Sequence, residues 1–214
     1  MANRLKRVVL TLSLSCAAVT SLQGCVAIVV GGAVMGTIAA TDRRTLGAQT
    51  EDRAIVIKGE AAIRRALGET AHVNVNSFNR RALLTGEVAD EAAKATAEKE
   101  VKAIQGLVQV QNEIQIAGLS NFSSRSADTV ITTKVKTAFV ETTNVYGSAF
   151  KVITEGGSVY LMGRVTRREG DLAASVASRV NGVRKVVKVL EYISEDELRA
   201  MQAQSGKISL EEEK

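Results

Sequence analysis

Two hydrophobic periods alternate along the chain, and their order occurs twice. Apolar residues three or four positions apart predict amphipathic helices, as at Ile131, Val135 and Phe139. Segments in which apolar and polar residues alternate predict strands, and short turns join the first two strands of each copy into a hairpin. In the first copy the predicted helices and strands are 52–67, 72–78, 82–88, 90–105 and 108–116, and in the second they are 127–143, 150–156, 158–165, 167–181 and 183–193.

The predicted order αββαβ defines the fold class. A helix between the second and third strands favours a parallel crossover, whereas the hairpin is antiparallel. We therefore expect an α+β fold of two tandem domains, each with a three-stranded mixed sheet packed against two helices. Each copy spans about 65 residues, close to the size at which one core supplies only a few kcal/mol, so we expect the two domains to pack against each other.

Four glycines recur at equivalent places in the two copies. Gly86 and Gly163 lie inside predicted strands, where glycine indicates a bulge or a close approach of backbone. Gly106 and Gly182 lie where the second helix of each copy should end. We assign all four a structural role.

The first 24 residues have the pattern of a secretory signal peptide, with basic residues, an apolar run and then small residues. The sequence Leu22-Gln23-Gly24-Cys25 resembles the lipobox of bacterial lipoproteins, which implies cleavage before Cys25 and acylation of its thiol. The alternative is a signal-anchor helix prolonged by 26–40. That stretch has only fifteen apolar or small residues, whereas a spanning helix needs about 20.

Three sequence features carry a family resemblance. They are the strand Leu84-Thr85-Gly86-Glu87-Val88 with its counterpart Leu161-Met162-Gly163-Arg164-Val165, the entry Gly182-Val183-Arg184-Lys185-Val186 to the last strand, and the tract 41–47. The repeat resembles the BON domain, named for bacterial osmotic-shock and nodulation proteins. With the lipobox, residues 1–193 are similar to the dual BON-domain outer-membrane lipoproteins of Gram-negative bacteria.

This resemblance implies a location and a domain plan. The protein would be held in the outer membrane, facing the periplasm, by acyl chains such as palmitate on Cys25. The expected parts are a signal peptide (1–24), a lipidated tether (25–50), domain 1 (51–117), a linker (118–125), domain 2 (126–193) and a short C-terminal helix with a mobile acidic tail (194–214).

Charge divides unevenly between the two copies. Residues 51–117 hold 9 basic and 10 acidic side chains, whereas residues 125–192 hold 11 basic and 6 acidic ones. A basic domain tethered to a membrane is attracted to anionic headgroups. The family resemblance implies that the first helix of domain 2 binds anionic phospholipid, and the residues we place on its outward face are Thr129, Val130, Thr133, Lys134, Lys136, Thr137 and Val140.

An ordinary solvated helix face is the competing interpretation of these seven residues. The family resemblance implies a Trp at the position where this chain has Val130, and Trp is the better interfacial anchor. Five arginines of domain 2 either extend the basic surface or are scattered solubilising charge; they are Arg164, Arg167, Arg168, Arg179 and Arg184.

The sequence contains no recognisable catalytic constellation. His72 is the single histidine, and the mature protein would keep no thiol besides the acylated Cys25. We therefore expect neither an enzyme nor a cofactor or metal site, with His72 a surface or partly packed residue. We expect no nucleic-acid partner, because the chain is exported and has no aromatic-interleaved basic patch. We expect a monomer.

Three functional hypotheses remain. The first is a lipoprotein that binds anionic phospholipid through domain 2 and supports outer-membrane integrity. The second is an adapter that contacts the machinery assembling outer-membrane proteins. The third is a structural envelope protein without a specific ligand.

Overall fold

The structure is a computed structural model that describes residues 42–68, 71–118 and 122–211. Residues 40–214 form one compact unit. The predicted signal peptide, the acylation site Cys25 and most of the predicted tether lie outside the described residues.

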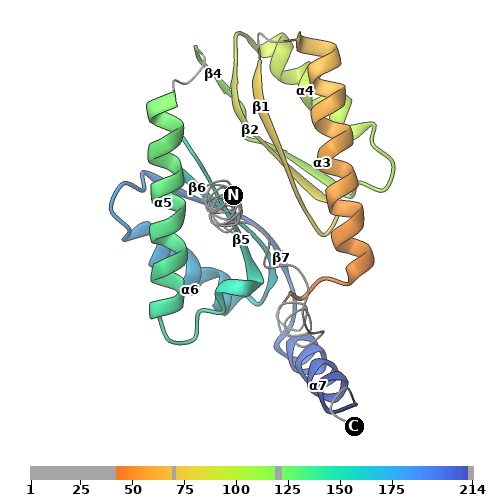
Figure 1. Cartoon of the computed structure of the whole chain (residues 1–214), viewed down its shortest axis with the longest axis vertical. Coiled ribbons are helices and arrows are strands. Elements are labelled where there is room, and N and C mark those ends of the chain that lie inside the picture. Colours follow the sequence, from red (N-terminus) through yellow and green to blue (C-terminus); the bar gives the residue numbers. More distant parts are fainter. Residues whose placement is uncertain (1–41, 69–70, 119–121, 212–214) are drawn as a thin grey trace, which may run out of the picture. The chain divides into compact units, whose positions relative to one another are not determined.

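Domain 1 has a mixed sheet with helices packed against it (Figure 1). Strand β1 pairs antiparallel with β2, and β2 pairs parallel with β3 and then β4. The elements are α3 (Leu46–Leu67), β1 (His72–Phe78), β2 (Arg81–Val88), α4 (Glu91–Lys102), β3 (Gln109–Asn112) and β4 (Gln115–Ile116).

Domain 2 repeats this plan. Strand β5 pairs antiparallel with β6, and β6 pairs parallel with β7. The elements are α5 (Phe122–Glu141), the 3-10 helix η2 (Gly147–Ala149), β5 (Phe150–Glu155), β6 (Ser158–Val165), α6 (Arg167–Ser178) and β7 (Lys185–Tyr192), followed by α7 (Glu195–Glu211). The predicted α+β fold with two αββαβ units is thus confirmed.

The third strand of domain 1 is divided, unlike its counterpart in domain 2. The side-chain oxygen of Asn112 accepts a hydrogen bond from the backbone nitrogen of Ile114, at 3.1 Å. This local bond competes with the ladder, as asparagine side chains commonly do. The register with β2 is the same on both sides of the break, so β3 and β4 are two parts of the one predicted strand.

Three helices are longer than the sequence pattern predicted, and one of them, α5, begins at Phe122 inside the predicted linker 118–125. Helix α3 begins at Leu46, inside the segment assigned to the tether, because the Thr45 hydroxyl accepts from the Ala48 nitrogen and caps it. Helix α7 begins after Ser194, whose hydroxyl accepts from the Glu197 nitrogen, and three acidic residues occupy its first turn. It extends to Glu211, where we expected a mobile tail.

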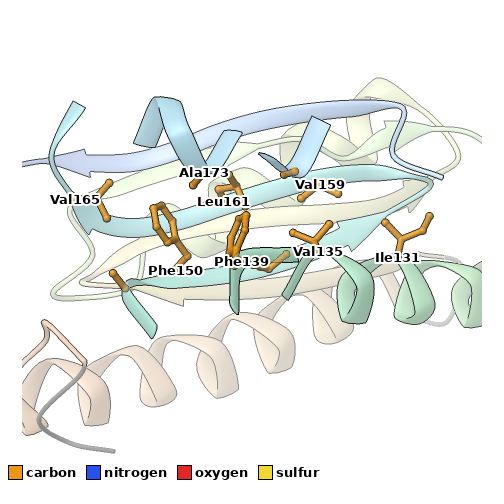
Figure 2. Close-up of a cluster of buried hydrophobic side chains, with 11 residues drawn as sticks. Ile131, Val135, Phe139, Phe150, Val159, Leu161, Val165 and Ala173 are labelled. Carbon is orange, nitrogen blue, oxygen red and sulfur yellow. The ribbon is translucent and has the colours of Figure 1, made fainter. Parts of the chain in front are cut away.

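Each domain has its own apolar core between helices and sheet. In domain 2, Val135 and Phe139 of α5 point toward Phe150 and Leu161 of the sheet (Figure 2). Domain 1 uses the equivalent faces, with Ile55 and Ile63 of α3 packed against Val75 and Leu84. The hydrophobic period of the first helix of domain 2 therefore predicted its buried face correctly.

A buried aspartate near the start of each first helix holds the hairpin turn of its domain. Asp52 accepts from the backbone nitrogens of Asn79 and Arg80, at 2.7 and 2.8 Å. Asp128 accepts from the nitrogens of Gly156 and Gly157, both at 2.8 Å. The turn residues of both hairpins have positive φ, between 49° and 75°, which leaves their N–H groups turned toward the carboxylate.

The strand glycines permit close contact with the neighbouring strand. A Cβ on Gly86 would lie 2.0 Å from the carbonyl oxygen of His72, and one on Gly163 would lie 2.5 Å from that of Ala149. Gly106 and Gly182 have φ of 87° and 99° and lie in the turn after each second helix, four residues beyond its last residue.

The two domains meet through the helix-free faces of their sheets. Phe78 and Leu83 of domain 1 form a buried cluster with Tyr160 and Met162 of domain 2. Polar contacts surround this cluster. They include Asn74 with Glu155 (2.9 Å), Asn79 with Glu191 (2.6 Å), Arg81 with Glu191 (3.6 Å) and Lys185 with Glu113 (3.9 Å).

The segment before α3 contacts both domains. Arg43 binds the carboxylate of Glu169, in α6, through two hydrogen bonds of 2.9 and 2.7 Å, and its guanidinium also donates to the Arg164 carbonyl oxygen. Arg44 binds Asp52 at 2.9 Å and lies 4.1 Å from the centre of the Phe78 ring. Two adjacent arginines thus join the domains from the N-terminal side.

We predict that Gly86→Ala lowers the free energy of unfolding by at least about 2 kcal/mol, because the added Cβ meets backbone and φ is positive. Gly118→Ala is the control, since a Cβ there meets nothing within 4 Å, and it should change stability by less than about 0.5 kcal/mol. Unfolding followed by circular dichroism measures both. Equal losses of unfolding free energy in the two variants would contradict the structural role assigned to Gly86.

We also predict that Asp52→Ala destabilises the protein more than Asp128→Ala. Asp52 accepts from Ser77 and Arg44 as well as from the turn, so its loss leaves a partly buried arginine without this partner and should cost about 3–5 kcal/mol. Asp128→Ala should cost about 1–3 kcal/mol. Asp171→Ala, which breaks an exposed pair with Lys188, is the control and should cost at most about 1 kcal/mol. The opposite order of the two losses in the same unfolding assay would count against this account.

Candidate functional site

The outward face of α5 is the surface that the sequence assigned to membrane binding. All seven predicted residues are exposed, and the opposite side of the helix is buried through Ile131, Val135 and Phe139. The geometry therefore presents Thr129, Val130, Thr133, Lys134, Lys136, Thr137 and Val140 together, and we call this set the α5 face.

Apolar groups lie at both ends of the α5 face. Val130 is 52% exposed and Val140 is 83% exposed, and ten residues of helix separate them by about 15 Å. Apolar residues of an amphipathic helix normally lie on its buried side, whereas these two valines are exposed.

The threonines reduce the polarity between the two valines. The hydroxyl of Thr133 donates to the carbonyl oxygen of Thr129 at 3.0 Å, and that of Thr129 donates to the carbonyl oxygen of Arg125 at 3.2 Å. Because each hydroxyl donates its hydrogen bond to a carbonyl oxygen of the same helix, it depends less on water for a hydrogen-bond partner. The centre of the α5 face is therefore mildly apolar.

The two lysines border this strip. At about 100° per residue, Lys134 and Lys136 lie on opposite sides of the line through Val130, Thr133 and Thr137. Neither lysine takes part in an ion pair within the described part of the chain. Long lysine side chains can extend their charged ends toward anionic groups while their stems stay along an apolar surface.

The five arginines that could have extended the basic surface contact other parts of the protein. Arg164 pairs with Glu191 and Glu197, and Arg168 pairs with Glu195. Arg167 lies over the ring of Tyr192, at 4.7 Å from its centre. Arg179 donates to Ser175, and Arg184 packs against the turn glycine Gly157. Arg164 and Arg168 pair with carboxylates, whereas no ion pair among the described residues includes Arg167, Arg179 or Arg184. None of the five belongs to α5, so Lys134 and Lys136 are the basic groups of the α5 face.

Sequence reasoning missed one exposed aromatic residue in the part of domain 2 that follows α5. Tyr146 is 50% exposed and lies in the loop that follows α5, before η2. A tyrosine can place its ring at a membrane interface with its hydroxyl in water. No period marks a loop residue, so only the structure shows that it is exposed.

Sequence reasoning also missed a group of metal-ligating side chains. Ligand atoms of His72, Glu87 and Glu155 lie within 4.8 Å of one another, and this is the one such group among the described residues. His72 and Glu87 face each other across β1 and β2, whereas Glu155 comes from β5. Only the packing of the two domains could bring the third residue to the other two.

None of the helices in the described residues combines the length and the apolar character needed to cross a bilayer.

Comparison with known proteins identifies the family. The BON domain matches residues 49–118 and 127–194, more than half of the chain. Over 174 residues the chain is 38% identical to outer membrane lipoprotein DolP of Haemophilus influenzae, an alignment that covers 80% of this chain and 90% of that protein.

Two further relatives align over most of their own length. The 21 kDa hemolysin of Actinobacillus pleuropneumoniae is 33% identical over 156 residues, covering 71% of this chain and 79% of that protein. Osmotically-inducible protein Y of Escherichia coli is 27% identical over 140 residues, covering 64% and 70%. Because both repeats match the family and the similarity to DolP extends over most of the chain, this chain belongs to the BON domain family as a two-domain member related to an outer membrane lipoprotein.

Proposed function

We propose that this chain is a non-catalytic lipoprotein, held in the outer membrane by acylated Cys25 and facing the periplasm, that binds anionic phospholipid through the α5 face and supports envelope integrity. The observation that carries the proposal is the α5 face itself, an exposed strip of valine and threonine bordered by two lysines without ion-pair partners among the described residues. The relationship to an outer membrane lipoprotein supports the envelope location.

The affinity that this face can supply is modest. Each lysine near an anionic surface contributes about 1 kcal/mol, and partial burial of two valines adds a similar amount. A lipid anchor makes such weak contacts sufficient, because it confines domain 2 near the bilayer and turns binding into an intramolecular event. Acyl chains would supply the stable attachment, and the α5 face would orient the domain on the surface.

Charge acts at longer range than these contacts. Domain 2 holds 11 basic and 6 acidic residues between 125 and 192, whereas domain 1 is nearly neutral. A positive field over one domain favours that domain's approach to an anionic bilayer, within the Debye length of about 8 Å at physiological salt. This asymmetry explains why the second domain, rather than the first, would meet the lipid.

We predict that replacing both lysines, Lys134→Gln and Lys136→Gln, weakens binding to phosphatidylglycerol-containing vesicles. Two contacts of about 1 kcal/mol each correspond to roughly a 30-fold loss of affinity. The matched control is Lys58→Gln with Lys99→Gln, which removes the same charge from exposed helix positions of domain 1. Co-sedimentation with the vesicles measures both pairs, and equal losses would show that net charge, rather than the α5 face, controls binding. The proposal would be refuted if the wild-type protein bound phosphatidylcholine vesicles as tightly as phosphatidylglycerol-containing vesicles.

We further predict that Val130→Trp strengthens vesicle binding severalfold. Val130 is half exposed, so a larger aromatic ring can enter the interface there without disturbing the core. Ile57→Trp on α3 is the control, because Ile57 is 61% exposed but belongs to domain 1. The same co-sedimentation assay applies. An equal gain in the control would show that any exposed Trp increases membrane binding. The result at Val130 would then not support a role for the α5 face.

A further inference from the structure

We propose that His72, Glu87 and Glu155 form a zinc-binding site that joins the two domains. The proposal does not depend on phospholipid binding. It begins with the pairing of β1 and β2, which places His72 directly opposite Glu87. The His72 Nδ1 atom lies 2.9 Å from the Glu87 Oε2 atom. The third carboxylate, Glu155, is the last residue of β5 in domain 2.

The carboxylate of Glu155 is buried without a cationic side chain bonded to it. The residue is 8% exposed, and no ion pair among the described residues includes it. Asn74 and Thr85 donate to it at 2.9 and 3.4 Å, and both bonds end on Oε2. Among the described residues, Oε1 therefore receives no hydrogen bond.

The local charge is negative. The buried carboxylate of Glu155 lies near the carboxylates of Glu87 and Asp128. Three carboxylates, those of Glu87, Asp128 and Glu155, lie around the imidazole of His72 and the guanidinium of Arg125, which together supply at most two positive charges. A divalent cation would balance this arrangement, because buried carboxylates are normally paired or bound to metal.

There is space for an ion and its water. A cavity of about 360 Å³ lies beside Glu155. Its lining includes His72, Asn74 and Glu155 together with Arg125, Asp128 and Thr129 of α5. A zinc ion with three protein ligands needs one further ligand, which is commonly water, and the cavity can admit it.

The donor set favours zinc over magnesium or calcium. Imidazole nitrogen suits zinc, whereas magnesium and calcium prefer oxygen ligands throughout. In a tetrahedral site with bonds of about 2.0–2.2 Å, ligand atoms lie roughly 3.3 Å apart. The present separations reach up to 4.8 Å, so the longest must shorten by about 1.5 Å, which rotation of a glutamate side chain provides.

Such a site would couple the two domains. Its ligands come from β1 and β2 on one side and from β5 on the other, so an ion bound there holds the sheet faces together and stabilises the folded protein by mass action. Its cavity also reaches Thr129, which belongs to the α5 face.

The test uses the full chain in non-ionic detergent, purified without a polyhistidine tag and stripped of metal with a chelator. Isothermal titration with zinc chloride should show one ion bound per chain. Glu155→Gln should lower the affinity at least tenfold, and magnesium chloride should bind far more weakly than zinc. Glu113→Gln is the control, because Glu113 is a carboxylate at the domain contact outside the cluster, and it should bind zinc like the wild type.

A second measurement keeps the proposal testable if Glu155→Gln does not fold. His72 is the single histidine of the chain, so selective isotope labelling of histidine gives one imidazole to follow by nuclear magnetic resonance. One equivalent of zinc chloride should shift its ring signals in the wild-type protein. Unchanged ring signals, or a Glu155→Gln variant that folds and binds zinc as tightly as the wild type, would overturn the proposal.

Discussion

Each sheet of this protein has two faces to cover, and only one of them is covered by helices. The other face carries large apolar side chains, Phe78 and Leu83 in domain 1 and Tyr160 and Met162 in domain 2, which exclude water only by packing against one another. Full burial of one such side chain contributes about 1.5–3 kcal/mol, a large share of what a domain of this size can supply. The domain contact is therefore a part of the folded core, and the positions of the other features follow from it.

Polar groups around this core make the contact specific. Arg43 reaches across to Glu169, whose carboxylate also accepts from the backbone nitrogen of Thr166 and so completes the cap of α6. Although burial opposes ionisation, these hydrogen bonds lower the pKa of Glu169. A planar guanidinium that forms two parallel bonds to a carboxylate fixes orientation as well as distance. The segment that leads into α3 is therefore also bound to domain 2.

The packing of the two sheets against each other also separates surface regions that differ in charge and polarity. The sheet faces are used between the domains, so the helices provide much of the remaining surface, and in domain 2 the exposed side of α5 combines valines with lysines that have no ion-pair partner among the described residues. The arginines of α6 and its neighbours contact acidic or aromatic groups. Net charge alone would have predicted a diffuse basic surface, whereas the exposed side of α5 places two lysines beside exposed valines. By contrast, the cluster around Glu155 is negative and lies where the domains meet.

The sequence by itself determined the type and order of the main helices and strands of the two repeats, because helix and strand periods are local properties that repeat after 76 or 77 residues. It also determined the buried side of α5, since inward positions such as Val135 and Phe139 follow from spacing alone. The hairpin turns followed from local chemistry, but their attachment to Asp52 and Asp128 did not, because 27 or more residues separate donor from acceptor. The break at Asn112 depends on one side-chain bond that no period reveals. Only the tertiary structure brought Arg43 to Glu169 and Glu155 to His72, because these contacts depend on how the two sheets pack. That packing depends on the shape and the burial of side chains that lie far apart in the chain.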